Sequence, residues 1–306
     1  MDALQNLRAF LSVAETGSFS AAARRSGLAT SVLTKRVDQL ERAVKTKLFV
    51  RTTRIVTLTE AGRRWIERVR SLVADFDDTM RQVSDTEHDL EGPLRVKAPT
   101  TLTVLYLADI LARFQAQNPK LSMEIVLADR AVNPADEGFD LAVAAFDAAF
   151  SDVVDIPLCP LRPMLCASPD YVARRGAPAH PRDLIAHDTL NFAPTGSIWS
   201  FNSPQGPTAV GINPRFSAND GQVLLRAALA GNGIALLSEY LTAPRLAAGE
   251  LVPVLESYQP PERWVKMLIP EARMQVARIS ALAQFLKDAF SPSPPWAAAA
   301  DDDSDS

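Results

Sequence analysis

Cysteine and histidine are scarce in this sequence of 306 residues, which has two of the first and three of the second. Cys159 and Cys166 stand seven positions apart in apolar surroundings. In a reducing compartment such a pair belongs more often to a core than to a disulfide, although a redox role stays open. His88, His180 and His187 form no group with cysteine or carboxylate at the spacing of metal ligands. We therefore expect neither a metal site nor a cofactor.

Long apolar runs and the common catalytic motifs are also missing. No run approaches the roughly 18 apolar residues that span a bilayer, and the chain up to Arg8 leads into amphipathic sequence and not into a secretory leader. There is no G-x-S-x-G elbow, no P-loop and no G-x-G-x-x-G, because the stretch GNGIAL lacks the third glycine. We expect a cytoplasmic protein that is not an enzyme and makes no membrane contact.

Positive charge is distributed unevenly along the chain. The net charge is −4, yet residues 19–64 contain eleven lysines and arginines against three acids. This asymmetry predicts an acidic partner for one end only. A solute-binding protein, the other alternative class besides an enzyme, leaves the basic segment unexplained. With 47% hydrophobic residues, the chain can bury the cores of two or three domains.

Three short helices with tight turns are predicted at the start of the chain. The first ends at Gly17, the second has Ser18 or Ser20 as its cap and closes at Gly27, and the third begins near Thr30. The stretch KLFVRTTRIVTLTEAG then alternates β-branched residues around a Thr-Thr-Arg turn, which predicts a hairpin. Together these elements favour a helix-turn-helix followed by a wing.

From Glu60 onward the apolar residues recur in alternating steps of three and four, a pattern typical of paired helices. The residues of this seam are Ile66, Val69, Val73, Phe76, Met80 and Val83. A lone helix would leave the seam in water. We therefore predict a linker helix over residues 60–91 that dimerises with its copy in a second chain. The alternative is a long helix laid on its own domain.

Beyond Gly92 and Pro93, strand-like and helical segments alternate, which predicts an α/β architecture with ligands beyond the carboxyl ends of strands. The strand-like stretches are LRVKA, LSMEIVL, FDLAVAAF, PMLCASP, DTLNF, GIALLS, LVPVL and WVKMLI. Helical patterns cover residues 103–117, 221–230 and 273–290. Residues 292–306 are acidic and biased in composition, and we expect them to be disordered.

Three stretches stand out by their order and spacing. They are LRAFLSVAETGSFSAAARRSGLATSVLTKRVDQLERAVKTKLFVRTTRIVTLTEAG, ASPDYVARRGAPAHPRDLIAHDTL and AALAGNGIALLSEYL. Together they resemble LysR-type transcriptional regulators, and the likeness extends from Leu4 to about Phe290. The resemblance implies a sequence-specific DNA-binding regulator with an N-terminal winged helix-turn-helix and a long linker helix. A regulatory α/β domain like a periplasmic binding protein would follow, with two subdomains around a cleft for a small-molecule effector.

The resemblance also implies boundaries and partners. The DNA-binding domain would cover residues 1–59, the linker helix 60–91 and the regulatory domain 92–291. Subdomain I would consist of residues 92–161 and 269–291, subdomain II of 162–268, and the tail of 292–306. Family members are usually dimers of dimers on interrupted palindromic DNA. We therefore expect a homodimer through the linker helix, a homotetramer, and RNA polymerase as a partner if the protein is an activator.

The polar third helix supplies the predicted DNA contacts, because a recognition helix turns hydrogen-bonding and cationic side chains to the major groove and keeps its other face in the core. The alternative is a solvated helix face. The predicted DNA-binding residues are Arg25, Thr30, Ser31, Thr34, Lys35, Arg36, Arg51 and Arg54, the last two on the wing along the DNA backbone. The family commonly has Ser-Gln where this chain has Ala29 and Thr30, so we expect Thr30 or Ser31 to cap the helix.

The predicted effector site lies where the first regulatory strand turns into a helix. Hydroxyl and free N–H groups at Thr100 and Thr101 favour a carboxylate or another anion, and plain capping is the alternative. By resemblance, the other predicted effector-binding residues are Phe146, Phe192, Trp199 and Asn219. Relatives often have arginine where this chain has Ala144, so we predict an aromatic or otherwise apolar carboxylate as effector. The aromatic side chains can equally belong to the core.

Overall fold

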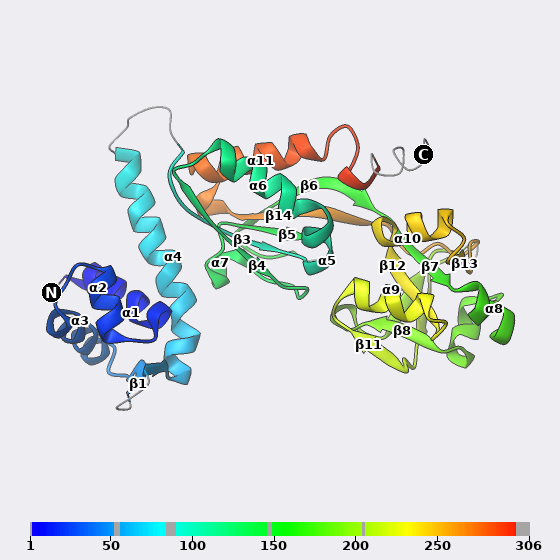
Figure 1. Ribbon diagram of the computed structural model, residues 1–306, viewed down its shortest axis with the longest axis horizontal. Helices are drawn as coiled ribbons and strands as arrows, with labels where there is room; N and C mark the ends of the chain where they lie inside the picture. The colour runs from blue at the N-terminus through cyan, green and yellow to red at the C-terminus, as the bar shows by residue number, and fades with distance from the viewer. Residues whose placement is uncertain (1, 52–55, 84–89, 146–148, 204–205, 298–306) are drawn as a thin grey trace. The chain divides into compact units, whose positions relative to one another are not determined.

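The computed structural model describes residues 2–51, 56–83, 90–145, 149–203 and 206–297, with the backbone alone for residues 81–83 (Figure 1). The chain forms two compact units, the first made of Met1–Asp89 with Asn133–Phe139, the second of Leu90–Val132 with Asp140–Ser306. Within the described residues, no helix is long and apolar enough to cross a membrane.

The first unit contains four short helices, a hairpin and one long helix. Its helices are α1 (Ala3–Thr16), α2 (Phe19–Arg25), α3 (Thr30–Ala43), α4 (Glu60–Val83) and the short α7 (Pro134–Glu137). Strands β1 (Phe49–Arg51) and β2 (Val56–Leu58) pair antiparallel. The side chains of Asp2 and Ser18 cap α1 and α2 by accepting backbone N–H bonds from Gln5 and Ala21. The three predicted helices and the hairpin are therefore confirmed.

Helix α3 begins without a side-chain cap. Its N-cap residue is Ala29, and no side chain accepts a hydrogen bond from its first turn. Thr34 Oγ1 instead donates to the carbonyl oxygen of Thr30, 2.9 Å away and inside the helix. The prediction that Thr30 or Ser31 takes over the cap is wrong, because both residues already lie in the helix.

The N-terminal half of α4 packs on the core of its own unit. Val69 and Val73 are 3% and 8% exposed and join the cluster formed by α1, α2 and α3, and Ile66 packs at its edge. Near the start of α4, a Cβ atom on Gly62 would lie 2.3 Å from the carbonyl oxygen of Leu48, so this close approach requires glycine.

This packing divides the predicted dimerisation seam. Val69 and Val73 were expected to face a second chain, which is wrong, because their own unit already buries them. The side chain of Val83 lies outside the described part of the chain. The large apolar side chains of α4 that remain exposed are Leu72, Phe76 and Met80, at 53%, 45% and 56%. They follow one another at intervals of four residues, so they form one apolar stripe.

Two five-stranded sheets form the second unit. The first has the order β4-β3-β5-β14-β6, from β3 (Gly92–Ala98), β4 (Leu121–Leu127), β5 (Leu141–Ala144), β6 (Val153–Leu161) and β14 (Arg263–Pro270). The second has the order β11-β8-β12-β7-β13, from β7 (Pro163–Ala167), β8 (Thr189–Phe192), β11 (Phe216–Ala218), β12 (Ile234–Ser238) and β13 (Val252–Pro253). Strands β9 (Ile198–Phe201) and β10 (Thr208–Gly211) form a separate hairpin. The predicted α/β architecture of two subdomains is confirmed.

Strands β6 and β14 are the two places where the chain crosses between the sheets. They pair antiparallel along their length, from Leu161 opposite Arg263 to Val153 opposite Pro270. Residue 268 was the expected end of subdomain II, whereas β14 belongs to the first sheet from Arg263 onward. Strands β6, β9, β10 and β11 were not foreseen from the sequence.

Helices flank both sheets (Figure 1). The first sheet carries the continuous helical stretch α5 (Thr100–Leu102), η1 (Thr103–Leu107, a π-helix) and α6 (Ala108–Gln117), together with α11 (Ala277–Ala289). The second carries α8 (Pro169–Arg175), α9 (Gly221–Leu229) and α10 (Glu239–Ala247). Short 3₁₀ turns are η2 (Pro181–Ala186), η3 (Ala193–Thr195) and η4 (Glu271–Arg273).

The segment after α11 packs against helices of both sheets. The Trp296 ring centroid lies 5.7 Å from that of Tyr106 in η1 and 5.5 Å from that of Tyr240 in α10. Its Nε1 donates to Glu239 Oε1 at 3.4 Å, and the side chain is buried. The expectation of disorder from residue 292 is therefore wrong for residues 292–297, and the rest of the predicted tail lies outside the described residues.

Candidate DNA-binding surface and effector cleft

One face of α3 is polar and accessible, while the other face is fixed in the core. Leu33 and Val37 are buried, whereas Thr30, Ser31 and Lys35 are exposed. Five of the predicted DNA-binding residues lie on this helix, and Thr30, Ser31 and Lys35 are brought together at its N-terminal part. This is the arrangement of a helix that can enter the major groove.

The half-buried members of the predicted set face inward. Arg36 Nη1 donates to Gln5 Oε1 of α1 at 3.3 Å, so its guanidinium lies between the two helices. Thr34 is half-buried and returns its hydroxyl to the helix backbone. Arg25, by contrast, is exposed, and its guanidinium pairs with Glu15 of α1 at 2.5 Å and lies 3.5 Å from Ser12 Oγ of the same helix.

Arg51 is held by two carboxylates of α3. Its Nη2 donates to Asp38 Oδ1 at 2.7 Å and lies 3.5 Å from Glu41 Oε2, and its guanidinium stacks 4.7 Å from the centroid of the Phe19 ring. The sequence placed Arg51 at the tip of the wing beside the DNA backbone, whereas the structure uses it to tie β1 to α3. Arg54, the other wing residue of the prediction, lies outside the described residues.

Glu41 is a buried carboxylate that joins α3 to β1. It accepts hydrogen bonds from the backbone N–H groups of Leu48 and Phe49, at 2.9 and 3.2 Å, and pairs with Lys47 at 2.6 Å. Burial pushes its pKa upward, but the bonds from Lys47 and from the two N–H groups outweigh burial, and the pKa lies below its usual value. Sequence reasoning counted Glu41 only as one of three acids in a basic segment.

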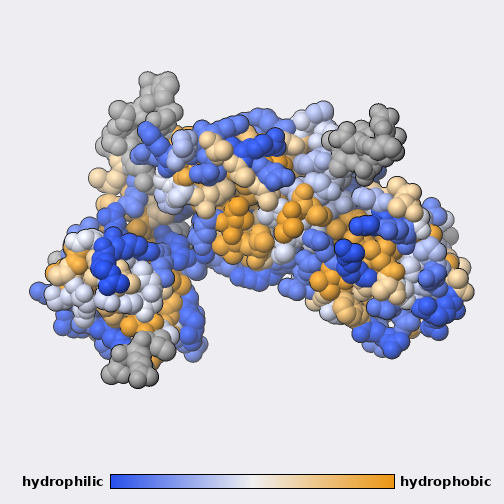
Figure 2. Space-filling view, viewed as in Figure 1, coloured by the Kyte–Doolittle hydropathy of each residue, from blue (hydrophilic) through white to orange (hydrophobic). Residues whose placement is uncertain are grey.

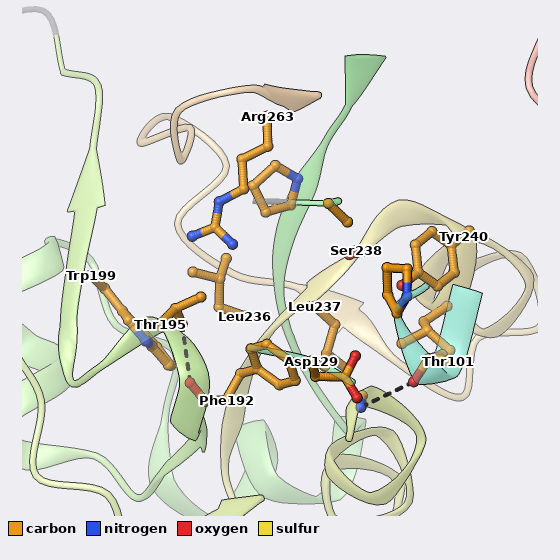
Figure 3. Close-up of a pocket in the computed structure, with 15 residues that line it drawn as sticks. Thr101, Asp129, Phe192, Thr195, Trp199, Leu236, Leu237, Ser238, Tyr240 and Arg263 are labelled. Atoms are coloured by element: carbon orange, nitrogen blue, oxygen red, sulfur yellow. Dashed lines mark hydrogen bonds between the residues drawn. The ribbon is translucent and has the colours of Figure 1, made fainter. Parts of the chain in front are cut away.

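A cavity lies between the two sheets of the second unit (Figure 3). Residues on the side of the first sheet are Pro99, Thr101, Asp129 and Ala145. Residues on the side of the second sheet include Phe192, Thr195, Trp199, Gly221, Leu236, Leu237, Ser238, Tyr240 and Leu241, and Arg263 comes from the crossing strand β14. The lining mixes apolar and aromatic side chains with polar and charged groups, so it offers both kinds of contact to a small molecule.

Thr101 connects the two walls of the cavity. Its hydroxyl donates to Asp220 Oδ2 at 3.0 Å and accepts from the N–H of Gly221 at 3.3 Å, at the start of α9. A Cβ on Gly221 would lie 2.8 Å from Leu241 Cδ1 and 3.5 Å from this hydroxyl, so glycine permits the approach. Of the predicted effector residues, Thr101 therefore lines the cavity and also holds its two sides together.

Thr100 has a different role from the predicted one. Its N–H donates to Asp129 Oδ1 at 3.0 Å, and its hydroxyl donates to the other carboxylate oxygen. The anion expected at this helix start is therefore a side chain of the protein itself. The prediction that Thr100 binds the effector is wrong, because Asp129 takes both of its donors.

The remaining predicted effector residues divide into three groups. Phe192 and Trp199 line the cavity, although Trp199 also belongs to the core of the second sheet, so the two roles coincide. Asn219 is exposed and does not line the cavity, which contradicts its predicted role. Phe146 lies outside the described residues.

Sequence reasoning missed Asp129, Ser238, Tyr240 and Arg263. Burial raises the pKa of Tyr240 to about 12, and the nearby carboxylates Asp129 and Asp220 act in the same direction, against a hydrogen bond with Ser238. The Tyr240 phenol therefore remains neutral at physiological pH. Arg263 supplies a cation that the loss of arginine at Ala144 had argued against.

The cysteines are part of the core. Cys159 and Cys166 are buried and unpaired with each other, and burial raises the pKa of each thiol to about 12. Thiolates, the reactive form, are therefore rare in the folded protein. Among the described residues, no group of histidine, cysteine and carboxylate side chains is arranged to hold a metal.

Two family models match the chain. The model of the bacterial regulatory helix-turn-helix protein, lysR family, matches residues 4–63, and the model of the LysR substrate binding domain matches residues 87–291. Their order along the chain agrees with the first and second units described above.

Relatives with similar sequences are HTH-type transcriptional regulators. The chain is 32% identical to DmlR of Escherichia coli over 292 residues, which covers 94% of each protein. It is 30% identical to PtxR of Pseudomonas aeruginosa over 290 residues, 93% of this chain and 92% of the relative.

Solved structures resemble the whole fold. CrgA, a LysR-type transcriptional regulator from Neisseria meningitidis, aligns with a TM-score of 0.58 and 27% identity over 94% of this chain and 98% of its own. The Vibrio cholerae virulence activator AphB aligns with a TM-score of 0.61 at 24% identity, over 92% and 98% of the two chains, and this second likeness concerns the fold alone.

Proposed function

The chain belongs to the LysR family of transcriptional regulators, and we propose that it reads its operator through the exposed face of α3. It is a DNA-binding regulator whose regulatory domain binds a small-molecule effector. In this proposal the protein acts on DNA in the cytoplasm, through binding and without a catalytic step.

The accessible polar face of α3 carries the operator proposal. Lys35 would donate to guanine O6 and N7, while Ser31 and Thr30 would contact a base edge or a phosphate. Arg36 and Arg51 would act indirectly, since their bonds to Gln5 and Asp38 fix the orientation of α3 against α1 and β1. An interrupted palindrome is the expected operator, because a symmetric dimer presents two such helices.

Retention of sheared genomic DNA by the purified protein at several salt concentrations tests this proposal. We expect a few fragments with a shared interrupted palindrome to persist at salt that removes the others, because phosphate contacts alone decline steeply with salt. Lys35→Ala should weaken binding to those fragments by about 10- to 100-fold, because this is the change in affinity that one well-formed contact with a base provides.

Lys287→Ala is the matched control, since it removes an exposed lysine from α11 in the second unit. It should leave fragment choice and affinity unchanged. If no fragment is enriched at any salt, or if both variants lose affinity equally, α3 is not the reading element.

We propose that the exposed stripe of Leu72, Phe76 and Met80 on α4 forms the dimer interface. Three exposed apolar side chains on successive turns support this assignment. A second interface that would complete a tetramer is supported by the exposed apolar side chains of Val104 and Leu105 in η1 and of Ile125 and Leu127 in β4. Figure 2 shows hydrophobic areas on the face of the second unit turned to the viewer. If the protein activates transcription, RNA polymerase would be a further partner.

The proposed effector is a small molecule with an apolar or aromatic body and a carboxylate. Phe192 and Trp199 would contact the body, and Arg263 would receive the carboxylate in place of the helix start at Thr100. A guanidinium has five N–H donors, so Arg263 can bind a ligand in addition to partners within the chain.

A further inference from the structure

Two carboxylates of the protein occupy the two helix starts that meet at the cavity. Asp129 accepts from the N–H and the hydroxyl of Thr100 where α5 begins. Asp220 accepts from the N–H groups of Gln222 and Val223, at 2.9 and 3.1 Å, where α9 begins. The positive helix ends that a LysR-type cleft could offer to an anionic ligand are therefore already used inside the chain.

The electrostatic balance at this end of the cavity follows from these contacts. A helix N-terminus carries roughly half a positive charge, and each carboxylate carries a full negative one. Within the described residues, neither Asp129 nor Asp220 has an ion-pair partner. Every hydrogen bond to these two carboxylates comes from a backbone N–H group or from a threonine hydroxyl, and neither donor is charged. The end of the cavity near Thr101 is therefore net negative, and it disfavours a second carboxylate.

The other charged group of the lining has the opposite sign and comes from another part of the fold. Figure 3 shows Asp129 beside Thr101 and Arg263 on a separate wall, with Leu236 and Phe192 also projecting into the cavity. A ligand that extends between the two charged groups would therefore meet an anion at one end, apolar contacts along its length and a cation at the other.

Building on the proposed effector cleft, we infer that the effector is a zwitterion of the amino-acid type. Its ammonium group faces Asp129, its carboxylate faces Arg263, and its apolar part packs against Phe192 and Trp199. Asp129 has accepting capacity beyond its two bonds from Thr100, because an ionised carboxylate offers about four lone-pair sites. A simple dicarboxylate would place like charge against Asp129 in a partly desolvated site, so the cleft rejects it.

Calorimetric titration of the full chain against matched probes tests this inference. The probes are the twenty common L-amino acids, the carboxylic acid and the amine obtained from each binder by removing its amino or carboxyl group, succinate and phenylacetate. We expect at least one apolar or aromatic amino acid to bind, and its deaminated acid to bind about 10- to 100-fold more weakly, the range of one charged hydrogen bond.

Asp129→Asn is the decisive variant, because the amide keeps one acceptor for Thr100 and removes the charge. This substitution should weaken the binding of the amino acid by a similar factor. It should also reduce the ratio of the affinities for the amino acid and for its deaminated acid. Asp109→Asn removes an exposed carboxylate from α6 and should change neither value.

Three results overturn the inference. They are equal or tighter binding of the deaminated acid or of succinate, an unchanged preference in Asp129→Asn, and no binding by any amino acid. If an acid without an ammonium group binds, the effector cleft stands and only the zwitterion assignment fails. Retention of operator fragments by the same protein without ligand reports separately on the DNA-binding proposal.

Discussion

Glu41 should determine the stability of the junction between α3 and the β1–β2 hairpin. Its side chain is 2% exposed and accepts from Leu48 N, Phe49 N and Lys47 Nζ, with Arg51 Nη2 at a longer 3.5 Å. Lys47 is 74% exposed, so its ion pair contributes little, about 0–1 kcal/mol. The two hydrogen bonds from backbone N–H groups therefore provide most of the stabilisation by Glu41.

Two substitutions separate charge from hydrogen bonding. Glu41→Gln keeps an oxygen for the N–H groups but loses the charge, which makes each bond weaker. We expect a cost of about 1–2 kcal/mol, the difference between charged and neutral hydrogen bonds. Glu41→Ala leaves both N–H groups buried without an acceptor, and we expect a loss of about 3–5 kcal/mol.

Native-state hydrogen exchange of the segment from residue 44 to 51 measures this loss where it occurs. Since about 1.4 kcal/mol corresponds to tenfold in an opening equilibrium, we expect roughly tenfold faster exchange in Glu41→Gln and a hundredfold or more in Glu41→Ala. Glu60→Gln is the control, because the Glu60 side chain is 80% exposed and its ion pair with Arg64 is long, at 4.0 Å. Unchanged exchange in Glu41→Ala, or an equal effect in Glu60→Gln, would refute the reasoning.

The stability that Glu41 contributes should decrease as the pH falls. The folded pKa of Glu41 lies below its ordinary value of 4.5, so its ionised form is favoured by folding. The stabilisation is fully present above pH values near 4.5 and is lost as pH falls through the lower folded pKa. The difference in thermal stability between the native chain and Glu41→Gln should therefore stay constant from pH 7 to about 5.5 and shrink at lower pH. A difference that grows on acidification would contradict the assignment.

Three further predictions concern other parts of the chain. Trp296→Ala should destabilise the second unit by about 3 kcal/mol, because it empties a buried aromatic site, and an unchanged urea midpoint would contradict that packing. Cys159 and Cys166, with pKa values raised to about 12, should resist iodoacetamide at pH 8 until urea unfolds the protein, which mass spectrometry can follow, and rapid labelling of the native chain would argue against their burial. Phe76→Glu with Met80→Glu should shift sedimentation toward monomer while leaving the thermal stability of the first unit unchanged, and an unaltered oligomer would remove α4 as the interface.

The local elements of the first unit were predictable because their signals are local. Serine before a helix and glycine after one act within a few residues, and Ser18 performs the capping expected of it. Helix α4 shows the limit of such signals. The spacing of its apolar residues indicates that one face is apolar, but it does not indicate which part of the protein, or which partner, covers that face. Val69 is covered by its own unit, while Met80 remains exposed, and both have the same sequence pattern.

The cleft was only partly predictable because its polar groups come from distant segments. Thr101 was found because it begins a helix, whereas Arg263 was not found, since only the pairing of β14 in the first sheet brings it to the cavity. Nothing in the periodicity of a strand indicates such a position. The aromatic residues Phe192 and Trp199 entered through a resemblance and not through a local pattern.

Acidic side chains explain why the roles of Arg51 and Thr100 were predicted wrongly. In a sequence, Glu41 and Asp129 look like ordinary surface charges, and a helix start looks the same whether a ligand or the chain itself supplies its anion. Glu41 accepts a hydrogen bond from the N–H of Leu48 beside the hairpin, and Asp129 accepts one from the N–H of Thr100. Because a carboxylate at a helix start reverses the sign of the local potential, the position of this one side chain determines whether the cleft attracts an anion or a cation. The choice of effector therefore depends on a tertiary contact that no helix-start motif contains.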